Sequence, residues 1–207
     1  MRNTDTKTRI LTEALRLFAV GGYEAVTVEQ ISTAVGIKAP SLYKHYKSKR
    51  DIFDHIVLRM QEGDADKAGE HRMPDSNERA AEELTPLERI RQYSIAMFRY
   101  WTEEEFPSCF RRMLTLEQYR DPELARLHRD YLAGGPLEYM AAIFRKLTNS
   151  GGAAMQLALE FYGPMYLLYS VYDGTEDKEA VVSLLSAHID RFIARVESDY
   201  RTSGAAL

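Results

Sequence analysis

The sequence contains a single cysteine, Cys109, among its 207 residues. One cysteine excludes an intramolecular disulfide and is typical of a protein in a reducing cytosol. No apolar run approaches the roughly 20 residues that span a bilayer as a helix, and the start of the chain lacks the apolar stretch of a signal peptide. We therefore expect a cytoplasmic protein without a membrane partner.

Motifs typical of enzymes are absent as well. The histidines form no H-x-x-x-H pair, and the sequence has neither G-x-S-x-G nor a glycine-rich phosphate loop. The adjacent carboxylates of Glu103, Glu104 and Glu105 point around a helix and do not converge on one substrate. The sequence accordingly predicts no enzyme, no metal site and no cofactor.

An overall positive charge, which nucleic-acid binding favours, is lacking too, because the chain carries a formal net charge of −4. The charge is unevenly distributed, however. Residues 1–60 contain ten Lys+Arg and six Asp+Glu, a net charge of +4, and the remaining residues contain 17 and 25, a net charge of −8. This distribution indicates that only the N-terminal part meets phosphate groups.

Apolar residues at helical spacing occur along almost the whole chain, and no segment is a convincing strand. Two helices are expected to begin where a capping residue precedes proline, at Thr85-Pro86 and Asp121-Pro122. Later helices are expected to be interrupted at Gly134-Gly135-Pro136 and at Gly163-Pro164. The pattern predicts an all-α protein.

The helical pattern is weakest between residues 61 and 83, where glycine, proline and charged residues alternate. We expect a loop around Met73–Asn77 and a domain boundary close to it. The predicted domains are a three-helix N-terminal head over residues 1–48, a linking helix over residues 49–72, and a larger helical body over residues 73–207.

Residues 27–46 predict two short helices joined by a tight turn. Thr27 is placed to cap the first helix, because its hydroxyl accepts a hydrogen bond from an otherwise unpaired backbone N–H. Gly36 ends that helix, and Pro40 fits the first turn of a second helix that runs to Tyr46. The second helix presents Ser, Tyr, Lys and His outward, which suits a DNA groove better than a core.

Two overlapping stretches resemble the DNA-binding head of the TetR family of bacterial transcriptional regulators: LFAVGGYEAVT and TVEQISTAVGIKAPSLYKHYKSKRDIF. The resemblance covers residues 6–60, and the later helices match the family's body in order without a specific motif. Ser32 and Tyr46 depart mildly from the family, which usually has Ala and Phe there. We expect the hydroxyl of Tyr46 to reach solvent or a phosphate.

The resemblance implies a homodimer whose paired short helices enter successive major grooves of a pseudo-palindromic, double-stranded DNA operator. It assigns phosphate contacts to Thr27, His45 and Lys49, and a contact with the DNA backbone or a base to Tyr43. The variable positions near base edges are Lys38, Ala39, Pro40, Ser41 and Lys44. Taken singly, these residues are also compatible with packing aromatics or a solvated surface, and their clustering favours DNA contact.

The family's body holds an effector pocket, and here the residues after 60 carry ten of the thirteen tyrosines. Tyrosine combines apolar area with a hydroxyl, which suits a largely apolar ligand with a few polar groups. Tyr162, Tyr166 and Tyr169 are spaced to share one helix face, although such a stripe is more often part of a core. The candidate ligand-binding residues are Met97, Trp101, Phe110, Met113, Tyr131, Tyr139, Tyr162, Tyr166 and Tyr169.

The last two predicted helices resemble the family's dimerisation pair, which forms a four-helix bundle with its mate. An apolar surface on two helices is costly to expose to water, so we expect it to be covered by a second copy. The alternative is that these side chains close the core of one chain. The predicted seam residues are Leu157, Phe161, Pro164, Leu168, Leu185, Ile189 and Phe192.

Together these features predict a ligand-responsive DNA-binding regulator, a repressor that a small apolar or aromatic effector releases from its operator. The alternative is a small-molecule binding or sequestering protein whose head is non-functional. The sequence identifies neither the effector nor the operator.

Overall fold

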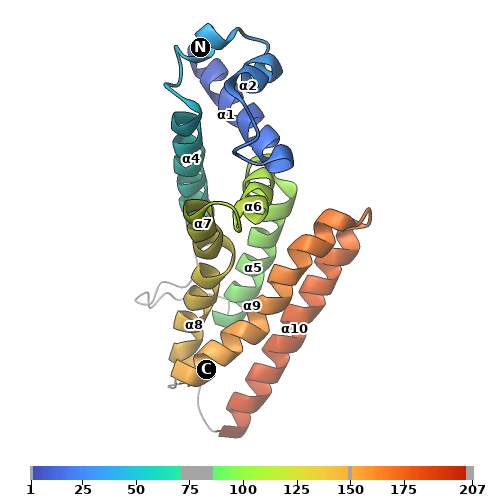
Figure 1. The fold of residues 1–207 in the computed structure, drawn as a ribbon. Coiled ribbons are helices and arrows are strands. Elements are labelled where there is room, and N and C mark those ends of the chain that lie inside the picture. The colour runs from blue at the N-terminus through green and yellow to red at the C-terminus, as the bar shows by residue number, and fades with distance from the viewer. Residues whose placement is uncertain (1, 71–85, 149–150, 204–207) are drawn as a thin grey trace. The chain divides into compact units, whose positions relative to one another are not determined.

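The computed structural model describes residues 2–70, 86–148 and 151–203. Within these ranges it contains ten helices and no strand (Figure 1), which confirms the all-α prediction. No helix of the described ranges combines the length and apolar character that crossing a membrane requires. In chain order the helices are α1 (Arg2–Gly21), α2 (Val28–Val35), α3 (Ala39–Leu42), α4 (Lys49–Glu70), α5 (Pro86–Glu103), α6 (Glu105–Glu117), α7 (Pro122–Leu132), α8 (Gly134–Thr148), α9 (Gly151–Gly174) and α10 (Lys178–Ser203).

The chain divides into two compact units, and each of them is discontinuous in sequence. The first unit comprises residues 1–68 and 103–128, and therefore contains α1 to α3, nearly all of α4, α6 and most of α7. The second unit comprises residues 69–102 and 129–207, and contains α5 and α8 to α10.

This division differs from the predicted domains in two respects. Residues 103–128 were expected in the body, yet they belong to the first unit, where α6 packs against α1. The predicted linking helix is not a separate part, because Phe53 and Ile56 of α4 are buried in the same unit. The predicted loop around Met73–Asn77 lies outside the described residues.

Helix α2 has the ends that the sequence predicts. The hydroxyl oxygen of Thr27 accepts the N–H of Gln30 at 3.2 Å, and the side-chain oxygen of Gln30 accepts the N–H of Thr27 at 2.8 Å. This reciprocal capping box satisfies two backbone donors at the helix start. At the other end Gly36 adopts a left-handed conformation with φ of 76°, as expected for a glycine that ends a helix.

Helix α3 is shorter than predicted, since regular helix ends at Leu42 and the chain continues to His45 as hydrogen-bonded turns. The N–H of His45 donates to the carbonyl of Leu42 at 2.8 Å, a tighter i to i+3 bond than an α-helix makes. Leu42 and Tyr46 are buried on one side of this segment, so its other side faces outward.

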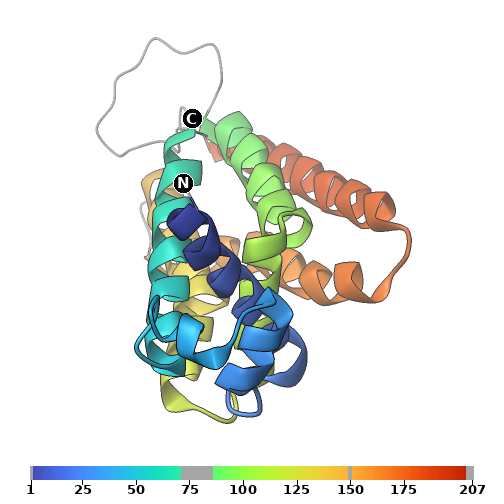
Figure 2. The same cartoon turned by 90° about the horizontal axis from the view of Figure 1, so that it is seen from above.

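In the second unit α9 lies against both α8 and α10, and Figure 2 shows α9 and α10 running antiparallel on either side of their connection. The core there is aromatic. The rings of Phe161 and Phe192 lie 5.0 Å apart, and both contact the ring of Phe144. Phe98 of α5 stacks on Tyr169 of α9 at 5.1 Å.

One expected interruption in this unit is not observed. Helix α9 runs through Pro164 without interruption, because the buried side chains of Phe161 and Met165 hold the backbone on both sides of the proline. Helix α10 begins after Asp177, whose carboxylate accepts the N–H of Ala180 at 3.0 Å. The predicted break at Gly134-Gly135-Pro136 is confirmed, since α7 ends at Leu132 and α8 begins at Gly134.

Candidate nucleic-acid interface

The outward side of α3 and the turn after it carries the residues that the sequence singled out for DNA contact. The Tyr43 side chain is 52% exposed, and Lys38, Pro40 and Lys44 are exposed as well. Ala39, Ser41 and His45 are half-buried. A short segment thus presents one aromatic hydroxyl and two ammonium groups together, which are the groups that bind phosphates and base edges.

Thr27 lies exposed at the start of α2, and its hydroxyl oxygen is already used as the helix cap. A hydroxyl that accepts one hydrogen bond still has a proton to donate. The side chain is therefore able to cap α2 and donate to a phosphate at the same time. The N-terminus of the helix adds a partial positive charge at the same place.

The ammonium group of Lys49 is used inside the head. It donates to the carbonyl oxygens of Tyr23 at 2.8 Å and Glu24 at 3.2 Å, and it lies 4.4 Å from the centre of the Tyr23 ring. Two of its three N–H groups are thus satisfied by the connection between α1 and α2. Only the third is left for the phosphate contact that the sequence predicted.

The hydroxyl of Tyr46 does not reach solvent or a phosphate, so that expectation was wrong. Tyr46 is 3% exposed, and its hydroxyl donates to the carbonyl of Lys7 on α1 at 3.2 Å. Burial, with a smaller contribution from Asp51, raises the pKa of this hydroxyl to about 12. The side chain therefore anchors the end of the helix-turn-helix to α1.

Comparison with known proteins agrees with this geometry. Residues 10–56 match the family model described as bacterial regulatory proteins, tetR family. Over these residues the head of the chain is similar to the TetR family. That family is one of transcriptional regulators and is generally non-enzymatic.

Curated relatives match this chain over a stretch of 51 residues. The negative transcriptional regulator IcaR of the biofilm operon icaADBC is 43% identical over 51 residues in Staphylococcus epidermidis, and 39% identical over 51 residues in Staphylococcus aureus. These matches cover 25% of this chain, and 28% and 27% of the two relatives. The chain therefore matches only about a quarter of the length of these relatives.

Solved structures match the fold over nearly the whole chain. A putative TetR-family transcriptional regulator from Mesorhizobium loti is 21% identical with a TM-score of 0.60, over 94% of this chain and 98% of that one. A complex of SmeT with triclosan is 18% identical with a TM-score of 0.64, over 92% of this chain and 91% of that one. At these identities the likeness establishes the fold alone.

The candidate ligand-binding residues are distributed over both units. Phe110 and Met113 are fully buried in the first unit, and the other seven candidates belong to the second. Within the second unit the rings of Trp101 and Tyr131 lie 6.0 Å apart. Tyr162 is 8% exposed, and its hydroxyl donates to the carbonyl of Leu132 at 2.8 Å.

The remaining candidates in the second unit differ widely in exposure. Tyr169 is buried and Met97 is half-buried, whereas Tyr139 and Tyr166 are each 41% exposed. Tyr166 thus lies on the solvent side of α9, although its spacing placed it with Tyr162 and Tyr169. Burial raises the pKa of the Tyr162 hydroxyl well above its usual range, so this group stays a neutral donor.

Four of the predicted dimer residues are buried within the second unit itself. Phe161, Leu185, Ile189 and Phe192 are each less than 5% exposed and form its core, as the alternative interpretation held. Leu157, Pro164 and Leu168 are half-buried. The apolar side chains that α9 and α10 leave exposed are a different set: Met155, Leu159, Tyr166, Leu167, Val171 and Leu184.

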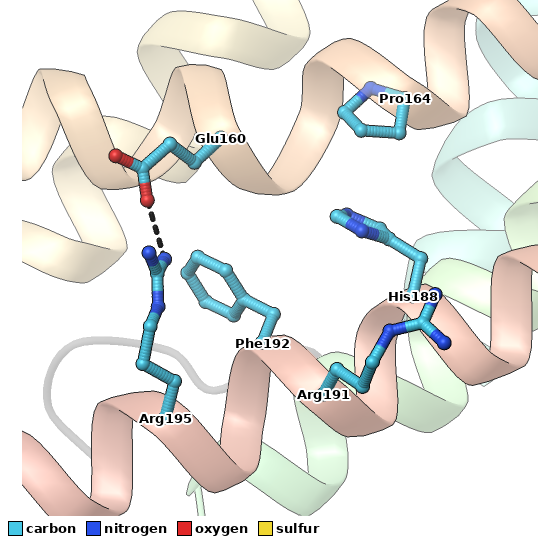
Figure 3. A pocket seen from close by; sticks show the side chains of 6 residues that line it. All are labelled: Glu160, Pro164, His188, Arg191, Phe192 and Arg195. Atoms are coloured by element: carbon cyan, nitrogen blue, oxygen red, sulfur yellow. Dashed lines mark hydrogen bonds and ion pairs between the residues drawn. The ribbon is translucent and has the colours of Figure 1, made fainter.

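A groove with a volume of about 420 Å³ lies between α9 and α10. Figure 3 shows the side chain of Phe192 and the ring of His188 directed into it, and the ion pair between Glu160 and Arg195 at one end. Pro164 and Arg191 complete its lining.

Sequence reasoning missed two residues that position the helix-turn-helix. Arg9 of α1 donates to the carbonyl of Val35 at 2.8 Å and so holds the C-terminal end of α2. Glu117 of α6 accepts the N–H of Tyr23 at 3.1 Å. No local signal marks either residue, because Arg9 lies 26 residues and Glu117 lies 94 residues from its partner in the sequence.

Proposed function

We propose that this chain is a DNA-binding transcriptional repressor that a small, largely apolar or aromatic effector releases from its operator. The observation that carries the proposal is the joint exposure of Lys38, Tyr43 and Lys44 on α3 and the turn after it. These groups lie in the part of the chain with a net charge of +4, while the rest is acidic. Repression is supported by the match of the head to IcaR, which is a negative regulator.

The proposed partner is a pseudo-palindromic DNA operator bound by a homodimer in the cytoplasm. One α3 segment covers few base pairs, so a two-fold pair is needed for a site of useful length. Support for the dimer comes from the exposed apolar side chains of α9 and α10, among which Leu167 is 63% and Leu184 is 56% exposed.

The proposed effector site uses the aromatic side chains of the second unit. Trp101, Tyr131 and Tyr162 supply ring surface and a hydroxyl whose ordinary partner is a backbone carbonyl. A ligand that replaced this carbonyl as the hydrogen-bond partner of Tyr162 would need an acceptor oxygen beside an apolar body. SmeT, a structural neighbour, is known in complex with triclosan, which is consistent with an effector of this kind.

Selection of genomic DNA fragments tests the proposal. Fragments retained by the purified chain are sequenced, and the affinity for the enriched fragment is measured between low and high salt. A repressor should retain specific fragments, with an affinity that falls linearly in a plot of log K against log[salt]. Uniform retention of all fragments, or none, would favour the sequestering protein and overturn the proposal.

Single substitutions then locate the interface. Lys38→Ala and Lys44→Ala should each weaken binding and reduce the salt slope by about 1 if the lysine contacts a phosphate. Tyr43→Ala should weaken binding as well and change the salt slope less, because its hydroxyl is uncharged. Lys146→Ala is the matched control, since Lys146 is also exposed but lies on α8.

A further inference from the structure

Glu117 is a carboxylate in an unfavourable place. It is 1% exposed, although a buried charge is costly unless it is paired and hydrogen-bonded. It is also the last residue of α6, where the helix dipole disfavours negative charge. Neither burial nor the position in the helix favours a glutamate here. The reason for this residue therefore has to lie in its hydrogen-bond and ion-pair contacts.

The contacts of Glu117 lie on the connection between α1 and α2. Its Oε1 atom accepts the backbone N–H of Tyr23 at 3.1 Å and lies 3.5 Å from Nη1 of Arg120, whose side chain is 65% exposed. Its Oε2 atom is buried and has no hydrogen-bond partner among the described residues. The one hydrogen bond that this side chain accepts thus comes from the connection.

Gly22 makes this contact sterically feasible. Its φ of +82° is a left-handed conformation that side chains other than glycine rarely adopt. A Cβ atom at this position would lie 2.2 Å from Oε1 of Glu117. The carboxylate of Glu117 therefore occupies the space that a Cβ atom of residue 22 would take, and only glycine leaves that space free.

Tyr23 connects three helices of the first unit. The centre of its ring lies 5.2 Å from the centre of the Phe18 ring of α1 and 5.1 Å from that of the Phe53 ring of α4. Its carbonyl accepts a hydrogen bond from Lys49 of α4, and its N–H donates to Glu117 of α6. Tyr23 precedes Thr27, the cap of α2, by only three intervening residues, so the path of this connection sets where α2 begins.

The segment that contains Glu117 is joined to the second unit at both of its ends. Residues 103–128 belong to the first unit, while residue 102 before them and residue 129 after them belong to the second. A change in the second unit therefore has a covalent route to α6 from either side. Its continuation to α2 is the hydrogen bond between Glu117 and Tyr23.

We infer that Glu117 is a positioning residue for DNA binding: through the N–H of Tyr23 it fixes the connection that places α2 and α3. The inference rests on the proposed function, since it assigns a role in operator binding. It requires that loss of the carboxylate weaken DNA binding while the chain remains folded, because the buried charge contributes orientation and not stability.

The test compares Glu117→Leu, Glu117→Gln and wild type in the full chain. Hydrogen–deuterium exchange of the peptide that contains Tyr23 reports the hydrogen bond directly and needs no DNA. Affinity for the DNA fragment selected by the wild type reports function, and thermal unfolding reports the fold. Glu117→Leu should expose the Tyr23 amide to faster exchange and lower the affinity about tenfold, the factor expected for one lost hydrogen bond to a charged group.

Two comparisons make the result specific. Glu117→Gln keeps an acceptor oxygen for Tyr23 and should stay close to wild type in exchange and affinity. Gly22→Ala should lose affinity by more than Gly36→Ala, because both glycines have left-handed backbones but only Gly22 faces the carboxylate. Arg120→Ala should leave the Tyr23 amide protected.

The outcomes separate the inference from the function on which it rests. Unchanged exchange and affinity in folded Glu117→Leu would overturn the positioning role. Equal losses of affinity in Gly22→Ala and Gly36→Ala would overturn it too. If the wild type selects no DNA fragment, the proposed function fails, while protection of the Tyr23 amide still shows whether the hydrogen bond exists.

Discussion

The buried hydroxyl of Tyr46 shows how a single polar atom ties the helix-turn-helix to α1. We expect Tyr46→Phe to lower the free energy of unfolding by about 1 kcal/mol, because the carbonyl of Lys7 loses its donor in a part-buried place. Urea denaturation measures this change. Tyr43→Phe is the matched control, since its hydroxyl is on an exposed side chain, and equal effects of the two substitutions would contradict the anchoring role.

His128 makes the stability of the chain depend on pH. Burial lowers the pKa of this ring below its ordinary 6.5, so the unfolded chain binds a proton in a pH range where the folded chain does not. The free energy of unfolding therefore has its full value above pH 6.5. It falls as the pH decreases from 6.5 towards the pKa of His128 in the folded chain. Urea midpoints between pH 7.5 and 5.5 should decline, with about 6.5 as the onset.

Replacing the buried ring identifies its contribution. His128→Leu should flatten the decline of the urea midpoint over the same pH range, whatever it does to the midpoint at pH 7.5. His45→Gln, which removes a half-buried histidine on the candidate DNA face, should leave the decline in place. A decline that is the same in wild type and His128→Leu would rule out His128 as its source.

At the scale of elements, α2 is a helix whose two ends are determined locally. Thr27→Ala should reduce stability by about 1 kcal/mol, the usual loss for an N-cap hydroxyl. Thr33→Ala is the matched control in the same helix, because the hydroxyl of Thr33 only donates back to the carbonyl of Glu29. Thermal unfolding should show a clear loss for the first substitution and little or none for the second.

These local signals explain which elements were predictable from the sequence. A cap, a glycine at a helix end or a proline at a helix start acts within four residues, so the ends of α2 and the starts of α5 and α7 followed from the sequence. The length of α3 and the continuity of α9 did not follow from the sequence. Regular helix ends at Leu42 although Tyr46 is buried further along, and Pro164 lies between the buried side chains of Phe161 and Met165.

At the scale of the whole molecule, the exposed apolar side chains of α9 and α10 predict a dimer. Leu167→Glu should convert the dimer to monomer in sedimentation velocity, because a charge would replace a 63% exposed apolar side chain at the proposed interface. Val20→Glu on α1 is the control, since Val20 is 83% exposed but lies in the first unit. A wild-type chain that is already monomeric would contradict the proposal.

The candidate site was predictable in so far as it is contiguous in sequence. The residues of α3 and the cap of α2 followed from one stretch, whereas the roles of Glu117 and Arg9 depend on contacts that the fold creates over long separations. Hydrophobic spacing on α9 and α10 identified apolar faces but not what covers them. Phe161 and Ile189 therefore proved to be core, and Leu167 and Leu184 were left exposed.

The discontinuous first unit has a consequence for synthesis on the ribosome. The part of α1 that packs on α6 is made long before residues 103–128 exist. At ordinary translation speeds of about 5–20 residues per second, several seconds pass between the two. During this interval the nascent head is incomplete and its uncovered apolar side is open to chaperones, so a ribosome stalled ahead of α6 should carry a protease-sensitive head.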